Sequence, residues 1–261
     1  FFFFFQLKKG NSISLKLRSI VGFLPIFFLF FVEHELLEKL PNFTARMEWI
    51  LKNKPELANL VSHWEVEGKG GKHLMSVLRK TRLTRILKRM SDPNEFLSDY
   101  GIRSMSKVYE DKPFKFSVDG QDFTVKYTPA ESDSRMFGGN SNWRGPIWFP
   151  INFLIVESLQ RFHYYYGESL QIDYPTGSGE IRNLEFVADD LSYRLRSIFM
   201  KDKDGNMPFN GGNELLNRDE FFKNYIMFYE YFNGDTGMGI GASHQCGWTA
   251  TVAKLIQPRM L

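Results

Sequence analysis

Four long segments with helical spacing fill most of the second half of the chain, and they constrain the fold more than any other feature. They lie at about 146–167, 183–200, 219–232 and 245–256. They do not alternate with strands in a strand–helix–strand pattern. Long helices joined by loops predict an all-α domain.

The first half is predicted to contain helices with interruptions. Residues 19–39 and 43–53 have the apolar spacing of two helices, and Pro41 breaks the chain between them. The apolar run at 20–32 is interrupted by Pro25 and is shorter than the roughly 20 apolar residues that a bilayer requires. We therefore interpret it as a buried helix and predict no transmembrane segment.

A basic run, LRKTRLTRILKRM at 78–90, stands out from the otherwise mixed charges of a chain whose net charge is only +3. Such a run can meet nucleic acid or an acidic membrane surface. Its apolar residues recur at helical spacing, however, which leaves the lysines and arginines on one solvated face. We prefer this second interpretation and predict no nucleic-acid partner. The apolar residues are Leu78, Leu83, Ile86, Leu87 and Met90.

Residues 114–127 depart from the helical pattern. Apolar residues alternate with polar ones on both sides of Asp119-Gly120, a pair that tolerates the positive φ of a type I′ turn. This pattern predicts a β-hairpin inserted in an otherwise helical body. The alternating residues are Phe114, Phe116 and Val118 before the turn, and Phe123, Val125 and Tyr127 after it.

Three loops stand out, at 100–106, 137–148 and 228–248. They contain more glycine, aromatic and hydrogen-bonding residues than a loop needs merely to reverse the direction of the chain. Each lies next to the end of a predicted helix. In a ring of helices such ends gather on one face, so we expect the three loops to form a cleft together. The many glycines of 228–248 predict a backbone that passes close to another group.

The loop at 137–148 combines flat apolar rings with hydrogen-bonding groups. Trp143 and Trp148 offer aromatic faces, Asn140 and Arg144 offer hydrogen bonds, and Gly145 allows close backbone approach. This combination suits a sugar. The alternative is that the tryptophans belong to the core and that Arg144 forms an ion pair at a helix start, and residue types alone favour neither.

Glu230 is a lone carboxylate in an aromatic stretch. Low polarity around a carboxylate raises its pKa and makes it a better proton acceptor near neutral pH. The alternative is an ordinary glutamate on the exposed side of a helix. Asp235 is a rival, but it is placed like a turn residue that hydrogen-bonds to its own backbone. The aromatic neighbours of Glu230 are Phe228, Tyr229, Tyr231 and Phe232.

His244 and Trp248 end the same loop. His244 could bind substrate, ligate a metal or fill space, but no second His or Cys lies at ligand spacing, so we predict no metal site. Cys246 is the single cysteine, which excludes an internal disulfide framework and leaves the compartment open. No phosphate-binding loop, dinucleotide fingerprint or nucleophile elbow occurs, and we predict no cofactor.

Two motifs, GGNSNWRGPIWFPINFLIVESL and GDTGMGIGASHQCGWTATVAKLI, together with IRSMS, resemble the C-terminal part of glycoside hydrolase family 63. The resemblance extends over most of 15–257. It implies that residues 1–261 are the C-terminal portion of one (α/α)6 barrel, two concentric rings of six helices, with the hairpin near 114–127 added. The family's active site lies in a funnel of loops at one end of the barrel.

The resemblance also implies inverting hydrolysis of α-glucosidic or α-mannosidic bonds. An acid protonates the leaving oxygen while a base activates water on the opposite face of the sugar. Glu230 occupies the place of the family's base. The family's sugar-pocket segment maps to Trp143, Arg144 and Gly145, and Trp148, Asn140, His244 and Trp248 complete the expected substrate contacts.

The family's general acid is an aspartate in an upstream motif, which we do not find before residue 100. The predicted helices are also fewer than the family's twelve. We therefore expect this chain to be a fragment of an inverting α-glycosidase that is inactive alone. The alternative is a catalytically inactive helical protein that binds carbohydrate. The oligomeric state stays open.

Overall fold

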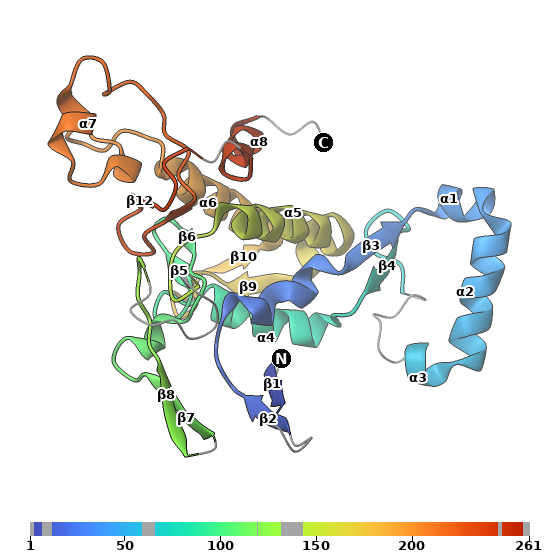
Figure 1. Ribbon diagram of the computed structural model, residues 1–261. Coiled ribbons are helices and arrows are strands. Elements are labelled where there is room, and N and C mark those ends of the chain that lie inside the picture. The colour runs from blue at the N-terminus through green and yellow to red at the C-terminus, as the bar shows by residue number, and fades with distance from the viewer. Residues whose placement is uncertain are drawn as a thin grey trace. The chain divides into compact units, whose positions relative to one another are not determined.

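The computed structural model describes residues 3–6, 12–58, 66–118, 120–131, 143–244 and 247–257. Helices and short antiparallel hairpins alternate along this part of the chain (Figure 1), which is compatible with a helical fold but contains more hairpins than the single one expected. The chain divides into two compact units. The first unit comprises 1–22, 92–153 and 191–261, and the second comprises 23–91 and 154–190. A single (α/α)6 domain over 1–261 stays a prediction.

The predicted helix at 19–39 is wrong. The chain forms a 3₁₀ helix, η1 (Ile20–Phe27), then strand β3 (Leu29–Val32) and then helix α1 (His34–Lys39). Pro25 lacks the N–H that a regular α-helix needs, and the aromatic run after it suits a strand. β3 pairs antiparallel with β4 (His73–Ser76). The apolar run is buried only in part, because Ile26 and Val32 are buried while Phe28 and Phe30 are exposed.

The second predicted helix is confirmed as α2 (Pro41–Asn53), followed by the short α3 (Pro55–Ala58). Pro41 does not lie in a linker between two helices, as predicted. It is the first residue of α2, a position where its missing N–H has no intrahelical partner to lose. Met47 and Leu51 of α2 pack against buried Val32 and Leu37.

The basic run forms helix α4 (Lys80–Met90), as the apolar spacing predicts. Leu83, Leu87 and Met90 are buried on one side. The charged residues Lys80, Arg82, Arg85, Lys88 and Arg89 are exposed.

The hairpin is confirmed. β7 (Phe114–Val118) pairs antiparallel with β8 (Gln121–Val125), and Gly120 has the positive φ that the turn requires. Asp119 lies outside the described residues. Val125 and Tyr127 join Met105 and Tyr109 in a small core of the first unit. Two short strands, β5 (Leu97–Ser98) and β6 (Gly101–Ile102), precede the 3₁₀ helix η2 (Lys107–Tyr109).

Two of the four long segments are confirmed as helices α5 (Phe149–Tyr166) and α6 (Leu184–Ser197). Pro150 lies in the first turn of α5, where it is tolerated. Leu154 and Tyr164 are exposed, so α5 is not buried all round as predicted. Between the two helices lie η3 (Gly167–Ser169), β9 (Gln171–Asp173) and β10 (Ile181–Asn183).

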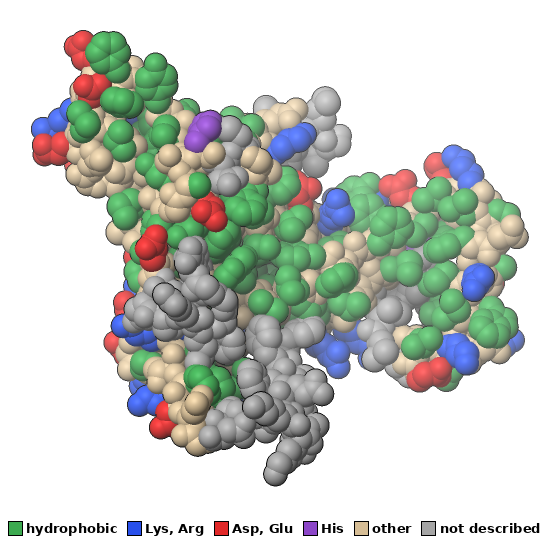
Figure 2. All heavy atoms as spheres, viewed as in Figure 1, with side chains coloured by type: hydrophobic (Ala, Val, Ile, Leu, Met, Phe, Trp, Pro, Cys, Tyr) green, Lys and Arg blue, Asp and Glu red, His purple; other side chains and the backbone are tan. Residues whose placement is uncertain are grey.

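The predicted helix at 219–232 is wrong. Asp219 accepts hydrogen bonds from the amides of Phe221 and Phe222 and so closes a turn. The chain then extends into strand β11 (Tyr231–Phe232), which pairs with β12 (Gly239–Ile240). Apolar residues at helical spacing in this segment, such as Phe222 and Ile226, are exposed and do not form the buried face of a helix. Figure 2 shows hydrophobic side chains at the surface around α7 (Glu214–Arg218), and the exposed ones are Leu215, Phe221, Phe222, Tyr225 and Ile226.

The fourth segment is shorter than predicted. η5 (Thr249–Thr251) leads into α8 (Val252–Ile256), and residues 245–246 lie outside the described part. A further 3₁₀ turn, η4 (Pro208–Asn210), precedes α7, and β1 (Phe3–Gln6) pairs with β2 (Ser12–Leu15) near the N-terminus. Within the described ranges, no helix combines the length and apolar character needed to cross a membrane.

Candidate functional site

Ile147 joins the three loops that the sequence singled out. It forms an antiparallel bridge with Arg103 on one side and with Phe232 on the other. The Ile147 and Phe232 backbones exchange two hydrogen bonds, of 2.8 and 3.0 Å. The described parts of the three loops therefore meet as expected, and the cleft between them stays a prediction.

A stack of aromatic rings lies beside this ladder. The ring of Trp148 is nearly parallel to that of Trp143, with centroids 4.5 Å apart, and stacks on Tyr231 at 5.0 Å. Trp248 meets Trp148 edge-on at 5.7 Å. Trp148 is buried, whereas Trp143 is 41% exposed, so the stack ends at the surface. The position of Tyr231 next to Glu230 in the sequence does not by itself predict this stacking.

Glu230 lies immediately before β11 and not at a helix end. Its backbone N–H donates to the carbonyl of Ala242 (2.9 Å), and its side-chain Oε2 accepts from the N–H of Ala242 (3.2 Å). The indole of Trp248 donates to the Glu230 carbonyl (3.1 Å). The side chain is half-buried, and these contacts hold it at the open end of the β11–β12 hairpin.

Two glycines make this close approach possible. Gly241 has φ +76°, and a Cβ there would lie 2.7 Å from Oε2 of Glu230. A Cβ on Gly239 would lie 2.1 Å from the ring of Tyr229. The groups that the glycine-rich backbone passes are therefore the side chains of Glu230 and Tyr229.

Tyr231 lies in a buried, negatively charged setting. Burial raises its pKa to about 12, and the carboxylates of Glu131 and Glu230 act in the same direction. A hydrogen bond to Glu131 contributes as well. The phenol therefore stays protonated, and two carboxylates lie within electrostatic reach of it.

Arg144 and Gly145 are buried. Only 2% of Arg144 is exposed, and its carbonyl accepts from the N–H of Thr128 (2.9 Å). The N–H of Gly145 donates to the hydroxyl of Ser104 (3.1 Å). The Arg144 guanidinium is therefore not open to solvent, and its role in substrate binding stays a prediction.

The remaining predicted residues are more exposed or lie outside the description. His244 is exposed, with its ring 5.9 Å from that of Phe228, and Trp248 is 37% exposed. Asn140 and Cys246 lie outside the described residues. In the part of the chain that is described, no group of three or more His, Cys, Asp or Glu side chains could hold a metal ion.

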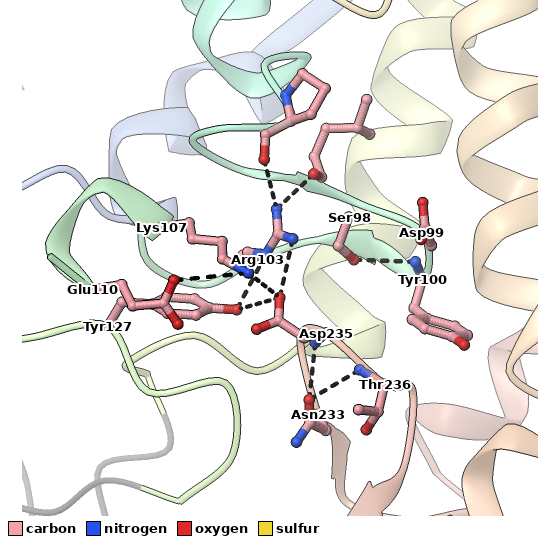
Figure 3. A network of polar contacts seen from close by, with 12 residues as sticks. Ser98, Asp99, Tyr100, Arg103, Lys107, Glu110, Tyr127, Asn233, Asp235 and Thr236 are labelled. Carbon is pink, nitrogen blue, oxygen red and sulfur yellow. Dashed lines mark hydrogen bonds and ion pairs between the residues drawn. The ribbon is translucent and has the colours of Figure 1, made fainter.

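Asp235 has a different role from the predicted one. Asn233 is the turn residue instead, since its side-chain oxygen accepts hydrogen bonds from the N–H groups of Asp235 and Thr236. Figure 3 shows the carboxylate of Asp235 facing Arg103, Lys107 and Tyr127 instead. Its Oδ1 lies 3.1 Å from Nη2 of Arg103, 3.2 Å from Nζ of Lys107 and 3.0 Å from the hydroxyl of Tyr127.

These donors decide the charge state of Asp235. Burial acts to raise its pKa, but the hydrogen bond from Lys107 and the charge of Arg103 outweigh it and lower the pKa below the ordinary value. The sequence offered one signal for this network, the basic residues in and just after the loop at 100–106, and no signal that Asp235 would meet them.

Comparison with known proteins finds a match to one protein family. Residues 73–175 match the Glycosyl hydrolase family 63 C-terminal domain. The resemblance to this family is thereby confirmed for residues 73–175. The family 63 match includes Arg103, Tyr127, Trp143 and Trp148, whereas Glu230 and Asp235 lie beyond it.

Three relatives extend the comparison. The chain is 47% identical over 249 residues to the uncharacterized protein YMR196W of Saccharomyces cerevisiae, which is 94% of this chain and 23% of that protein. It is 27% identical over 176 residues to the mannosyl-oligosaccharide glucosidase of the same yeast. It is also 27% identical over 175 residues to the probable mannosyl-oligosaccharide glucosidase of Schizosaccharomyces pombe. The two glucosidase matches each cover 67% of this chain and 15% of the relative. The chain thus spans less than a quarter of each relative's length.

Proposed function

We propose that this chain supplies the general base and part of the sugar-binding surface of an inverting α-glycosidase. The bond cleaved would be an α-glucosidic or α-mannosidic bond of an oligosaccharide or small glycoside. The observation that carries the proposal is the place of Glu230 beside the aromatic stack: it directly precedes Tyr231 of β11, and the indole of Trp248 donates to its backbone carbonyl.

The aromatic stack supports binding of a sugar. Trp143 is exposed at the end of the stack, and an indole face packs well against the C–H face of a pyranose. Trp148 and Tyr231 behind it fix the orientation of that indole. His244 and Asn140 are the proposed partners of sugar hydroxyls. Arg144, being buried, is proposed to shape the pocket wall with Gly145.

The hydrogen bonding of Glu230 supports its role as base. The N–H of Ala242 holds Oε2, which orients the carboxylate toward one direction of attack. An inverting reaction requires a second carboxyl group roughly 6.5–9.5 Å away, with a water between the two. We assign that acid to no described residue. Loss of general acid catalysis lowers a rate by about 10² to 10⁴, so we expect negligible hydrolysis from these 261 residues alone.

Titration calorimetry with a cationic iminosugar of gluco configuration tests the proposal, because its ring cation resembles the charge of the transition state. Loss of one charge-assisted hydrogen bond weakens binding by about tenfold to a hundredfold, which is the effect expected of Glu230→Gln. Loss of one stacking ring weakens it by about threefold to tenfold, which is the effect expected of Trp143→Ala. Glu214→Gln on α7 is the matched control, because Glu214 is exposed in the same unit. Equal affinity of the Glu230→Gln variant and the parent chain would refute the proposal.

A carbohydrate-binding protein without catalysis is the second candidate. It is favoured by one observation: the aromatic stack is formed within the described residues, and Trp143 is exposed at its end. This candidate predicts the same iminosugar binding with the Trp143 dependence but no Glu230 dependence. Release of sugar from an α-glucoside, abolished by Glu230→Gln, would exclude it.

A further inference from the structure

Arg103 is linked to the β11–β12 hairpin at two separate points. Its backbone bridges Ile147, which bridges Phe232 at the end of β11. Its side chain reaches Asp235, which lies in the turn between β11 and β12 (Figure 3). One residue therefore contacts the hairpin's tip directly and its first strand through one intermediate.

The guanidinium of Arg103 is fixed before it meets Asp235. Its side chain is only 8% exposed, and Nη1 donates to the carbonyls of Pro93 and Leu97. Nε donates to the hydroxyl of Tyr127 (3.1 Å). A planar fork with its other donors engaged offers Nη2 in one direction only, so the position of the Asp235 carboxylate is set by the body of the first unit.

The hairpin transmits that position to Glu230. Tyr231 pairs with Ile240 and Phe232 pairs with Gly239. Just beyond these pairs the register shifts by one residue: the Glu230 N–H donates to the carbonyl of Ala242, and the Ala242 N–H donates to Oε2 of Glu230. A displacement of the turn at Asp235 would therefore move both the Glu230 backbone and the donor that orients its carboxylate.

We infer that Arg103 and Asp235 form a positioning pair that sets the placement of Glu230 and the Tyr231 end of the aromatic stack. The inference rests on the proposed function for its catalytic meaning. Neither residue is catalytic itself, because each acts through the hairpin. Lys107 and Tyr127 support the pair as further donors to Asp235.

Four variants of the 261-residue chain test this inference. They are Asp235→Asn, Asp235→Glu, Arg103→Lys and the double variant Arg103→Lys/Asp235→Asn. Asp99→Asn is the matched control, because Asp99 also pairs with an arginine, Arg194, in the first unit but has an exposed side chain. Two quantities are measured for each: the Kd of the gluco-configured iminosugar, and the near-ultraviolet circular dichroism of the stacked indoles and phenol. Far-ultraviolet circular dichroism reports whether the variant is folded.

Misplacing an oriented group by about 1 Å can lower a reaction rate about a hundredfold. Because Asp235→Asn should misplace Glu230 and the end of the stack, we expect it to weaken iminosugar binding by about tenfold or more. The near-ultraviolet signal should fall while the far-ultraviolet spectrum is kept. Asp235→Glu should restore part of both, since it keeps the charge. The double variant should bind no more weakly than Asp235→Asn alone, because coupled residues are not additive.

Three outcomes separate this inference from the proposed function. If folded Asp235→Asn keeps the parent's Kd and near-ultraviolet spectrum, the positioning pair is refuted. If Asp235→Asn fails to fold, Arg103→Lys decides, because it keeps the charge and changes only the fork; an unchanged spectrum and Kd in that variant also refute the pair. If Glu230→Gln leaves Kd unchanged while Asp235→Asn lowers the near-ultraviolet signal, the proposed function fails and the positioning of the stack stands.

Discussion

The hydroxyl of Thr249 donates a hydrogen bond of 2.7 Å to the backbone carbonyl of Tyr229. Next to it, the indole of Trp248 donates to the carbonyl of Glu230. The chain at 229–230 is not helical, so these carbonyls lack the amide partners that a helix provides. Side chains from the start of η5 supply those partners and tie the end of the glycine-rich loop to its beginning.

Thr249→Val should destabilise the protein by about 1–3 kcal/mol, because an isosteric side chain leaves the Tyr229 carbonyl without its donor. Thr249 is fully buried, so water does not replace the lost bond. Urea unfolding monitored by tryptophan fluorescence measures the change. Thr236→Val, at an exposed position in the same unit, is the control. A similar cost for both variants would contradict this reading of Thr249.

Gly241→Ala should cost about 1–3 kcal/mol of stability from its left-handed backbone alone. The new Cβ would also press on Oε2 of Glu230 and on the ring of Tyr231, each 2.7 Å away. Gly212→Ala is the matched control, because a Cβ there meets nothing within 4 Å. The free energies of unfolding of the two variants should therefore differ clearly, and equal values would count against the close packing of Glu230 on Gly241.

Tyr231 should make stability fall at high pH. Its folded pKa of about 12 lies above the ordinary 10.0, so ionisation is easier in the unfolded chain. The stability it contributes is fully present below pH 10 and is lost as the pH rises toward 12. Across that window the parent chain should lose about 2 kcal/mol more than Tyr231→Phe. The exposed Tyr193→Phe should follow the parent, and a parent-like pH slope in Tyr231→Phe would contradict the assignment.

Leu87→Ala should destabilise the second unit by about 2–5 kcal/mol, because it opens a cavity under α4. Arg85→Gln, on the exposed face of the same helix, should change stability by no more than about 0.5 kcal/mol. Urea unfolding of the two variants compares the faces directly. Equal effects would mean that the basic face does more than stay solvated.

Much of the fold follows from local pattern. α4, α5, α6 and the β7–β8 hairpin lie where apolar periodicity and turn residues predict them, because each carries its signal within a few turns of chain. The helix predicted at 219–232 failed for a non-local reason. Its backbone groups at 231–232 pair with β12, and Phe232 also bridges Ile147; helical periodicity in a single segment cannot reveal such partners.

The candidate site divides in the same way. Residue types drew attention to Trp143, Trp148, Trp248 and Glu230 without deciding between a sugar site and a structural role, and the described parts of the three loops do meet. The roles of Tyr231 and Asp235 were missed because they depend on groups from other loops. Asp235 looks like a turn residue in its own sequence, and only the fold brings Arg103, Lys107 and Tyr127 to it.

Ile147 has backbone partners on both sides that come from distant stretches of the chain. Closing such long connections costs entropy before any contact repays it, so pairings of this kind form slowly. α5 and α6 need only neighbouring residues to begin, and they can precede the pairings at Ile147. We therefore expect a partly folded chain that already contains both helices still to lack the arrangement around Glu230, because that arrangement depends on these distant pairings.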